Sequence, residues 1–134
     1  MLFDIHSDSP VPIYEQIVTQ IMFGIASRAV EPGAMIPSVR EMAQRFLVHP
    51  NTVARAFQEL ERRGVVEAKR GRGMEVTPDA TVLCRVWRKE IVRIRIREVL
   101  REAASSALPP EDIRNLVEEE LARVNGQRQN AEKH

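Results

Sequence analysis

Apolar residues recur every three or four positions in several segments of this chain, which is the spacing of amphipathic helices. The first such segment follows Pro12 and places Ile13, Ile17, Ile21 and Ile25 at intervals of four. Proline suits the first position of a helix, because the N–H that it lacks has no partner within the helix there. We therefore predict a helix that begins at Pro12 and turns this isoleucine stripe toward a core.

Two shorter periodic segments follow, and a turn is predicted between them. Ser38 stands three residues before Glu41, which is the spacing of a capping box at a helix start. Pro50 disfavours the helical conformation in the residue before it and suits the start of a new helix. Gly64 can end that helix as a left-handed C-cap. The pattern predicts helix, turn, helix, with these apolar residues joining the isoleucine stripe in one core: Phe46, Leu47, Val53, Phe57 and Leu60.

After Gly64 the pattern changes to two short strands, 65–68 and 74–76, around the sequence KRGRG. Glycines allow the chain to reverse tightly there. Three basic side chains beside them, Lys69, Arg70 and Arg72, suit a phosphate backbone. A helix-turn-helix followed by a basic hairpin is a winged helix, so these residues predict a protein that binds nucleic acid.

The segment beyond residues 77–79, the predicted linker, has two competing patterns. Residues 92–97 alternate as in a strand, but apolar residues also recur every three or four positions. We predict a helix over 80–104, because more than 20 residues without Gly or Pro are too long for a strand in a small domain. A last helix is expected after Pro110, with Gly126 as its cap and a frayed tail from about 127.

Composition narrows the class of protein. The chain has 134 residues, of which 43% are hydrophobic and 29% charged, as in a folded rather than a disordered protein. No apolar run approaches the roughly 20 residues that cross a bilayer, and the N-terminus lacks the layout of a signal peptide. The single cysteine, Cys84, allows no internal disulfide and fits a reducing compartment. We therefore expect a cytoplasmic protein that does not associate with a membrane.

The net charge of +1 conceals a polarised layout. Residues 28–73 carry nine Lys/Arg against five Asp/Glu, and residues 85–101 carry seven against two. Residues 102–120 reverse the sign, with six acidic residues against one arginine. The first basic segment contains the predicted winged helix. The other two have opposite charges, which favours pairing of the C-terminal helices within one chain or between two chains.

Together these patterns predict a mostly α (α+β) fold. Residues 1–77 form a winged helix-turn-helix, and residues 78–134 form a short helical hairpin with apolar surface left over. A second copy of the chain can cover that surface, since homo-oligomers usually close with two-fold symmetry; the alternative is a hairpin that packs on its own winged helix. The predicted dimerisation residues are Trp87, Ile91, Ile94, Val99, Ile113, Leu116, Val117 and Leu121.

The sequence also resembles a known family. PSVRE and VHPNTVARAFQELERRGVVEAKRGRG resemble the winged-helix domain of GntR-family bacterial transcription regulators, and PIYEQIVTQI with the short C-terminal region is similar to the YtrA subfamily. The resemblance implies a dimer formed through a short helical segment, no large ligand-binding domain, and pairing of residues 34–36 with the wing. The wing departs from the family pattern at Met74-Glu75, where Thr and an aromatic residue are usual.

The predicted DNA-binding residues lie at the two helix starts and in the wing: Ser38, Arg40, His49, Asn51, Thr52, Arg55, Lys69, Arg70, Gly71, Arg72 and Gly73. Arg55 is the strongest candidate for a guanine contact, and Asn51 can read adenine. The resemblance implies that Arg40 contacts DNA, although it can instead pair with Glu41 or Glu59. His49 suits either a phosphate contact or a helix cap.

Several residues keep a second interpretation. Tyr14 is either a phosphate contact or a residue at the edge of the core, and Asn51 and Thr52 can be ordinary residues of a helix start. A charged wing tip can be a solvated surface, and Arg62 and Arg63 are expected to complement the helix dipole rather than touch bases. The basic face of residues 85–101 is a rival surface for DNA.

The function predicted from these residues is a sequence-specific transcription regulator, in first place a repressor, that binds a two-fold symmetric operator in double-stranded DNA as a homodimer. The alternative is a winged-helix module that binds proteins. An enzyme is not predicted, because the three scattered histidines and the cysteine form no nucleophile–base pair or metal set. We expect no cofactor and no metal, and the sequence identifies no small-molecule effector.

Overall fold

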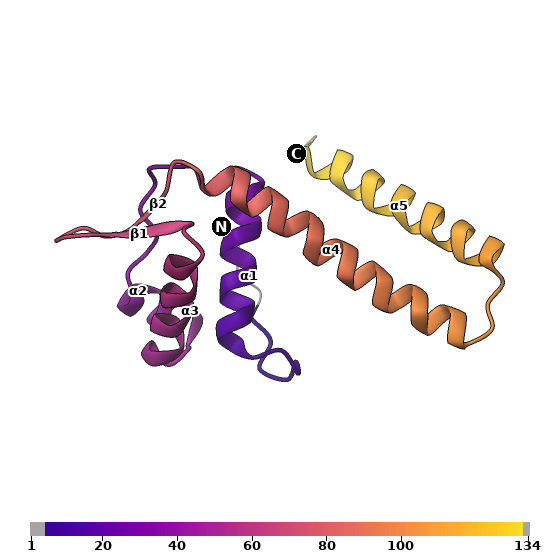
Figure 1. Ribbon diagram of the computed structural model, residues 1–134, viewed down its shortest axis with the longest axis horizontal. Helices are drawn as coiled ribbons and strands as arrows, with labels where there is room; N and C mark the ends of the chain where they lie inside the picture. Colours follow the sequence, from indigo (N-terminus) through magenta and orange to yellow (C-terminus); the bar gives the residue numbers. More distant parts are fainter. Residues whose placement is uncertain (1–4, 133–134) are drawn as a thin grey trace. The chain divides into compact units, whose positions relative to one another are not determined.

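The computed structural model describes residues 5–132, which form five helices and a two-stranded antiparallel sheet (Figure 1). This confirms the predicted mostly helical fold with a small hairpin. The elements in chain order are α1 (Ile13–Ala26), α2 (Val39–Phe46), α3 (Pro50–Arg62), β1 (Val66–Lys69), β2 (Gly73–Val76), α4 (Ala80–Ser105) and α5 (Pro110–Glu132).

The chain divides into two compact units, residues 1–90 and 91–134, and α4 begins in the first and ends in the second. The division at 77/78 predicted from the sequence therefore falls earlier than the division in the structure. The reason is that the first turns of α4 belong to the core of the winged helix. Ala80, Thr81 and Cys84 are all buried there.

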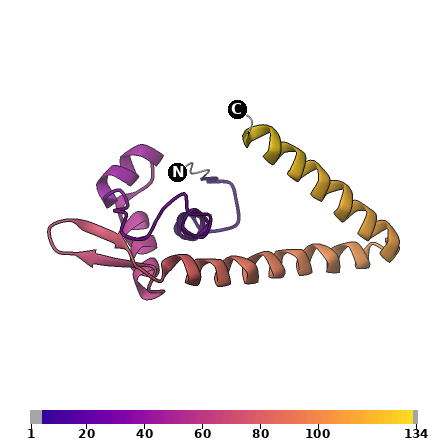
Figure 2. The same cartoon turned by 90° about the horizontal axis from the view of Figure 1, so that it is seen from above.

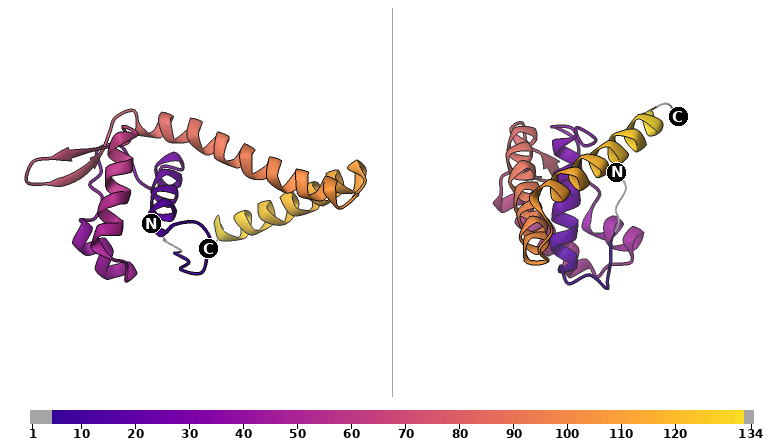
Figure 3. Two further views of the ribbon diagram at one scale, coloured as in Figure 1. Left: turned by 60° about the horizontal axis from the view of Figure 1, so that its bottom comes forward. Right: turned by 90° about the vertical axis from the view of Figure 1, so that its right-hand side faces the viewer.

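The core of the first unit lies between α1, α2, α3 and the base of the hairpin. Helices α1 and α3 lie side by side (Figure 3). The isoleucine stripe of α1 faces inward as predicted, since Ile17, Ile21 and Ile25 are at most 1% exposed. The buried residues of α3 face it: Val53, Ala56, Phe57 and Leu60.

Leu47 is a correction to the predicted core, because 93% of it is exposed. It ends α2 in the left-handed conformation, with φ 54° and ψ 47°. The chain needs this conformation to turn from α2 into α3, and it points the side chain of Leu47 outward. Its neighbour Val48 packs against the core instead. A left-handed backbone is strained for leucine. The geometry of the turn therefore determines the placement of Leu47, against the preference of its side chain for burial.

The hairpin is a two-stranded wing with Val66 opposite Val76 and Lys69 opposite Gly73. It extends away from the helices of its unit (Figure 2). Residues 34–36 pair with β2, as the family resemblance implies: the N–H of Ile36 donates to the carbonyl oxygen of Met74 at 3.0 Å. These bonds anchor the wing to the segment that leads into α2.

The second unit consists of the rest of α4 and α5, joined by a turn at 106–109. The helix predicted over 80–104 is confirmed, because three-or-four spacing outweighs the short alternating stretch. The predicted end at Gly126 is wrong, since α5 continues to Glu132. The frayed tail predicted from about 127 stays a prediction, and its last residues, 133 and 134, lie outside the described residues. A glycine inside a helix costs only about 1 kcal/mol relative to alanine, which the good helix formers around Gly126 offset.

Two threonines near the start of α4 offer a test of this core. Oγ1 of Thr81 is buried and has no hydrogen-bond partner in the described structure. Burying a hydroxyl without a partner is unfavourable, so we expect Thr81→Val to raise the free energy of unfolding by about 1 kcal/mol. Chemical denaturation of the full chain measures this change.

Thr77→Val is the matched control, because Oγ1 of Thr77 donates a hydrogen bond of 2.7 Å to the carbonyl oxygen of Gly64. Loss of that bond should lower the free energy of unfolding by about 1 kcal/mol. If both variants shift stability in the same direction, the difference between a satisfied and an unsatisfied hydroxyl is not what determines stability here.

Candidate nucleic-acid interface

The outer face of α3 carries a polar stripe opposite the core. Residues spaced by four, three and four positions share one side of a helix. On α3 these exposed residues are Asn51, Arg55, Gln58 and Arg62. Amide and guanidinium groups donate or accept hydrogen bonds in the manner that major-groove recognition requires. Arg62 is bonded to Glu59, which leaves three candidates: Asn51, Arg55 and Gln58. Gln58 was not predicted from the sequence, although its spacing from Asn51 and Arg55 was sufficient to identify it.

The start of α3 is fixed by His49. The backbone N–H of Asn51 donates to Nδ1 of His49 at 3.1 Å, so His49 is the N-cap. Of its two sequence interpretations, the cap is the one present in the structure. An accepting Nδ1 leaves the other ring nitrogen as the donor that remains for a phosphate. Asn51 is exposed beside it, whereas Thr52 is half-buried.

The start of α2 is fixed by Ser38, whose Oγ accepts a hydrogen bond of 3.1 Å from the backbone N–H of Glu41. This confirms the predicted cap. Arg40 follows in the first turn and is exposed. The Glu59 carboxylate, one of the two partners considered for Arg40, binds other arginines instead. Arg40 itself lies at the end of α2 where the helix dipole is positive, a position that favours an anion.

Glu59 joins the last turn of α3 to two arginines. Arg62 Nε donates to its carboxylate at 3.0 Å, and Arg63 Nε does so at 2.9 Å. The hydrogen bond from Arg62, followed by the one from Arg63, lowers the pKa of Glu59 from 4.5 to about 2. The stabilisation from this cluster is therefore present above pH 4.5 and is lost as the pH falls toward 2. Arg62 is thus held by a carboxylate within the chain.

Arg55 lies over an aromatic ring. Its Cζ is 3.9 Å from the ring centroid of Tyr14, which is the second residue of α1. Tyr14 is half-buried and packs against the core, and its hydroxyl donates to Oε1 of Glu15 at 3.2 Å. The structure thus places Tyr14 at the edge of the core and gives it a further contact that the sequence did not predict.

The wing presents its basic residues at the tip. The N–H of Arg72 donates to the carbonyl oxygen of Lys69 at 2.9 Å and closes the turn, and Gly71 inside it has φ 76°. Arg70 and Arg72 are exposed, whereas Nζ of Lys69 lies 3.6 Å from Oε2 of Glu67. The turn conformation requires glycine at 71, and it leaves two guanidinium groups exposed at the tip of the hairpin.

Comparisons with known proteins match this arrangement. The model of bacterial regulatory proteins of the gntR family matches residues 13–76. The chain is 31% identical over 129 residues to the HTH-type transcriptional repressor YtrA of Bacillus subtilis (strain 168), which is 96% of this chain and 99% of that protein. The chain belongs to the GntR family. The match to YtrA along almost its whole length confirms the YtrA subfamily, which was predicted from the sequence.

Solved structures of GntR proteins agree. A GntR family transcriptional regulator from Listeria monocytogenes superposes with a TM-score of 0.73 at 30% identity and covers 84% of this chain and 97% of its own. YtrA from Sulfolobus acidocaldarius, a GntR-family transcription factor, superposes with a TM-score of 0.58 at 32% identity, over 75% and 99% of the two chains. GntR proteins are DNA-binding transcription regulators and not enzymes.

The residues predicted for dimerisation of this GntR protein lie in both units and differ in their exposure. Trp87 lies in the first unit, where its ring centroid is 5.3 Å from that of Phe23 and Arg63 lies over it. The ring thus packs within the chain, and its part in dimerisation stays a prediction. Most of the others, which lie in the second unit, are exposed: Ile94, Val99, Leu116, Val117 and Leu121. Ile91 and Ile113 are half-buried.

Helix α4 carries a second apolar stripe, which was not predicted from the sequence to join the dimer interface. Val92, Ile96 and Leu100 are 42%, 52% and 38% exposed. With Arg95, Val99 and Val117 they line a groove of about 290 Å³. The first turns of α4 face the core through Ala80 and Cys84, whereas this later stripe lies on another side of the helix. The three-or-four spacing was visible in the sequence, but which stripe faced the core was not.

The single cysteine, Cys84, is buried in the core of the first unit. Burial raises the pKa of the Cys84 thiol to about 11, so the thiol stays protonated at neutral pH. No group of three or more potential metal ligands occurs among the described residues, and none of their helices has the length and apolarity of a membrane span.

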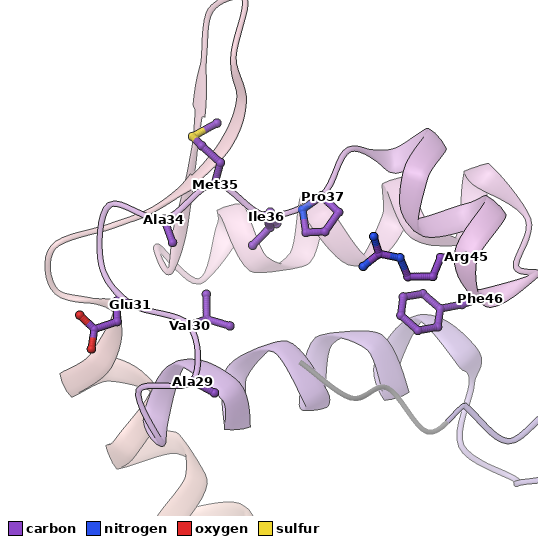
Figure 4. A pocket seen from close by; sticks show the side chains of 9 residues that line it. All are labelled: Ala29, Val30, Glu31, Ala34, Met35, Ile36, Pro37, Arg45 and Phe46. Carbon is purple, nitrogen blue, oxygen red and sulfur yellow. The ribbon is translucent and has the colours of Figure 1, made fainter.

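A recess of about 420 Å³ lies between Val30, Ile36 and Phe46, with Arg45 at its edge (Figure 4).

Proposed function

We propose that this GntR protein represses transcription by binding, as a homodimer, a two-fold symmetric operator in double-stranded DNA. The observation that carries the proposal is the exposed stripe of Asn51, Arg55 and Gln58 on α3, with a basic wing in the same unit. The relative in Bacillus subtilis is named a repressor, which supports repression rather than activation. Because its proposed target is DNA, we also propose that the protein acts in the cytoplasm.

Each contact has a chemical role. The stripe on α3 enters the major groove and reads base edges, with Arg55 on guanine O6 and N7 and Asn51 on adenine. Arg40 at the start of α2, and the ring donor of His49, bind phosphates. Thr52, at the same helix start, contacts a base edge or a phosphate. Arg70 and Arg72 at the wing tip, with Lys69 beside them, add charge-dependent affinity along the backbone, and Gly71 and Gly73 let the hairpin approach it closely.

Dimerisation rests on the exposed apolar side chains of the second unit. Contiguous apolar surface of this kind marks an interaction site on a soluble protein. The α4 part of the surface is basic around its apolar stripe, and α5 begins with Glu111 and Asp112. Two copies related by a two-fold axis therefore offer each other apolar and oppositely charged faces. Such a dimer presents two α3 helices to half-sites about one turn apart, roughly 34 Å.

The test is binding of the full chain to the DNA upstream of its own gene, titrated at several salt concentrations with unrelated DNA as competitor. We expect tight, competitor-resistant binding of a dimer, with an affinity that falls steeply as salt rises. Replacing Arg70 and Arg72 by alanine should remove about two phosphate contacts. The slope of log affinity against log salt should then be smaller by about two. Equal affinity for operator fragment and competitor at every salt concentration would refute specific DNA recognition and favour a protein partner for the winged helix.

A further inference from the structure

Arg55 and Tyr14 form a contact that the function proposed above does not use. The planar guanidinium lies 3.9 Å above the centre of the tyrosine ring. The side chain of Arg55 makes no hydrogen bond or ion pair with another residue in the described part of the chain, although Arg62, two turns further along the same face, is bonded to Glu59. The ring is therefore the structural partner of Arg55.

The position of the ring is itself fixed. Tyr14 packs against the core of the first unit and is half-buried. A second contact between the same two helices, Arg63 with Sδ of Met22 at 3.7 Å, lies eight residues further along both helices. A step of eight residues forward along α1 thus matches a step of eight residues forward along α3. The two helices therefore run in the same direction along this contact. The ring of Tyr14 thus belongs to a helix that packs along α3.

Stacking uses the face of a guanidinium and leaves its edge available. Arginine carries five N–H donors in the plane of the group, and it stacks on aromatic rings through the face of that plane. A guanine presents O6 and N7 to such an edge in the major groove. An arginine that is held before binding also loses less rotamer freedom when it meets the base. The ring of Tyr14 can therefore orient Arg55 without competing for its donors.

We propose that Tyr14 is a positioning residue for specificity: its ring holds the guanidinium of Arg55 in the plane in which it reads a guanine of the operator. This inference rests on the proposed function, since it needs a specific DNA site. It assigns the ring, and not the hydroxyl, because the hydroxyl already donates to Glu15. Tyr14 itself touches no base.

The test compares Tyr14→Phe, Tyr14→Ala and Tyr14→Leu in the full chain on three DNAs: the operator, the operator with the guanine replaced, and unrelated DNA. Tyr14→Phe keeps the ring and should bind within about twofold of the wild type. Tyr14→Ala should lose about five- to tenfold in operator affinity, the range of a stacked cation–π pair, with little change on unrelated DNA. Tyr14→Leu keeps apolar packing without a π face and should behave like Tyr14→Ala.

A double substitution separates positioning from folding. In an Arg55→Ala background, Tyr14→Ala should weaken operator binding by less than about twofold, because no guanidinium is left to orient. Equal loss in Tyr14→Phe and Tyr14→Ala would assign a contact to the hydroxyl and overturn the inference. Recovery in Tyr14→Leu, or equal loss on all three DNAs with a lower melting temperature, would reduce Tyr14 to packing. If the wild type itself does not prefer the operator, the proposed function fails first, and that outcome is recognised before any variant is made.

Discussion

Leu121→Glu is expected to convert the protein from a dimer to a monomer and to weaken operator binding by at least about 100-fold. Leu121 is 58% exposed in the single chain and lies on the same stripe of α5 as Leu116 and Val117. In a dimer this stripe is covered, so the variant buries a carboxylate in an apolar interface, which is strongly unfavourable. Two linked recognition helices gain about 10²–10⁴ in affinity over one, and the monomer loses that gain. Sedimentation and operator titration measure the two effects.

Ala122→Glu is the control for this prediction. It adds the same charge to the next residue of α5, which is exposed and lies on the side of the helix away from the stripe. We expect it to remain a dimer with an operator affinity close to that of the wild type. A Leu121→Glu chain that still sediments as a dimer would place the dimer contact elsewhere, and the exposed stripe would then need another occupant.

Parts of the fold and of the candidate site were visible in the sequence to different degrees because they depend on different scales of structure. Helix starts depend on neighbouring residues, so the spacing of Ser38 and Glu41 and the position of Pro50 were sufficient to place α2 and α3. The wing followed from its glycines and basic residues in the same way. In each case the chemistry that determines the element lies within a few residues.

The features that the sequence did not predict depend on how elements pack. The turn geometry that exposes Leu47 requires the relative placement of α2 and α3, which no local pattern of the sequence gives. The contact of Trp87 with Phe23, which the sequence did not predict, depends on how the start of α4 packs against α1. Gly126 is a helix stop by its intrinsic conformation, but the residues around it continue α5. The stacking of Arg55 on Tyr14 joins residues 41 positions apart, beyond any periodic pattern.

Arg55→Ala is expected to weaken operator binding by about 1–3 kcal/mol, or roughly 5- to 150-fold, and to relax the preference at one base position in each half-site. The physical reason is that the bidentate contact to guanine O6 and N7 is lost while the phosphate contacts of the wing remain. Binding to unrelated DNA should therefore change little. Selection of bound sequences from a random library, for wild type and variant, measures the preference directly.

Chemical changes in the DNA and a conservative variant identify this contact more closely. An operator with 7-deazaguanine at the relaxed position lacks the N7 acceptor, so it should weaken the wild type but leave Arg55→Ala unaffected. Arg55→Lys keeps the positive charge but not the planar pair of donors, and it should recover less than half of the lost discrimination. Arg62→Ala is the control, because Arg62 is already bonded to Glu59, and we expect it to retain base preference. If Arg55→Ala lost affinity equally on every sequence and lowered the salt slope by about one, Arg55 would instead be a phosphate contact, and base reading would then rest on Asn51 and Gln58.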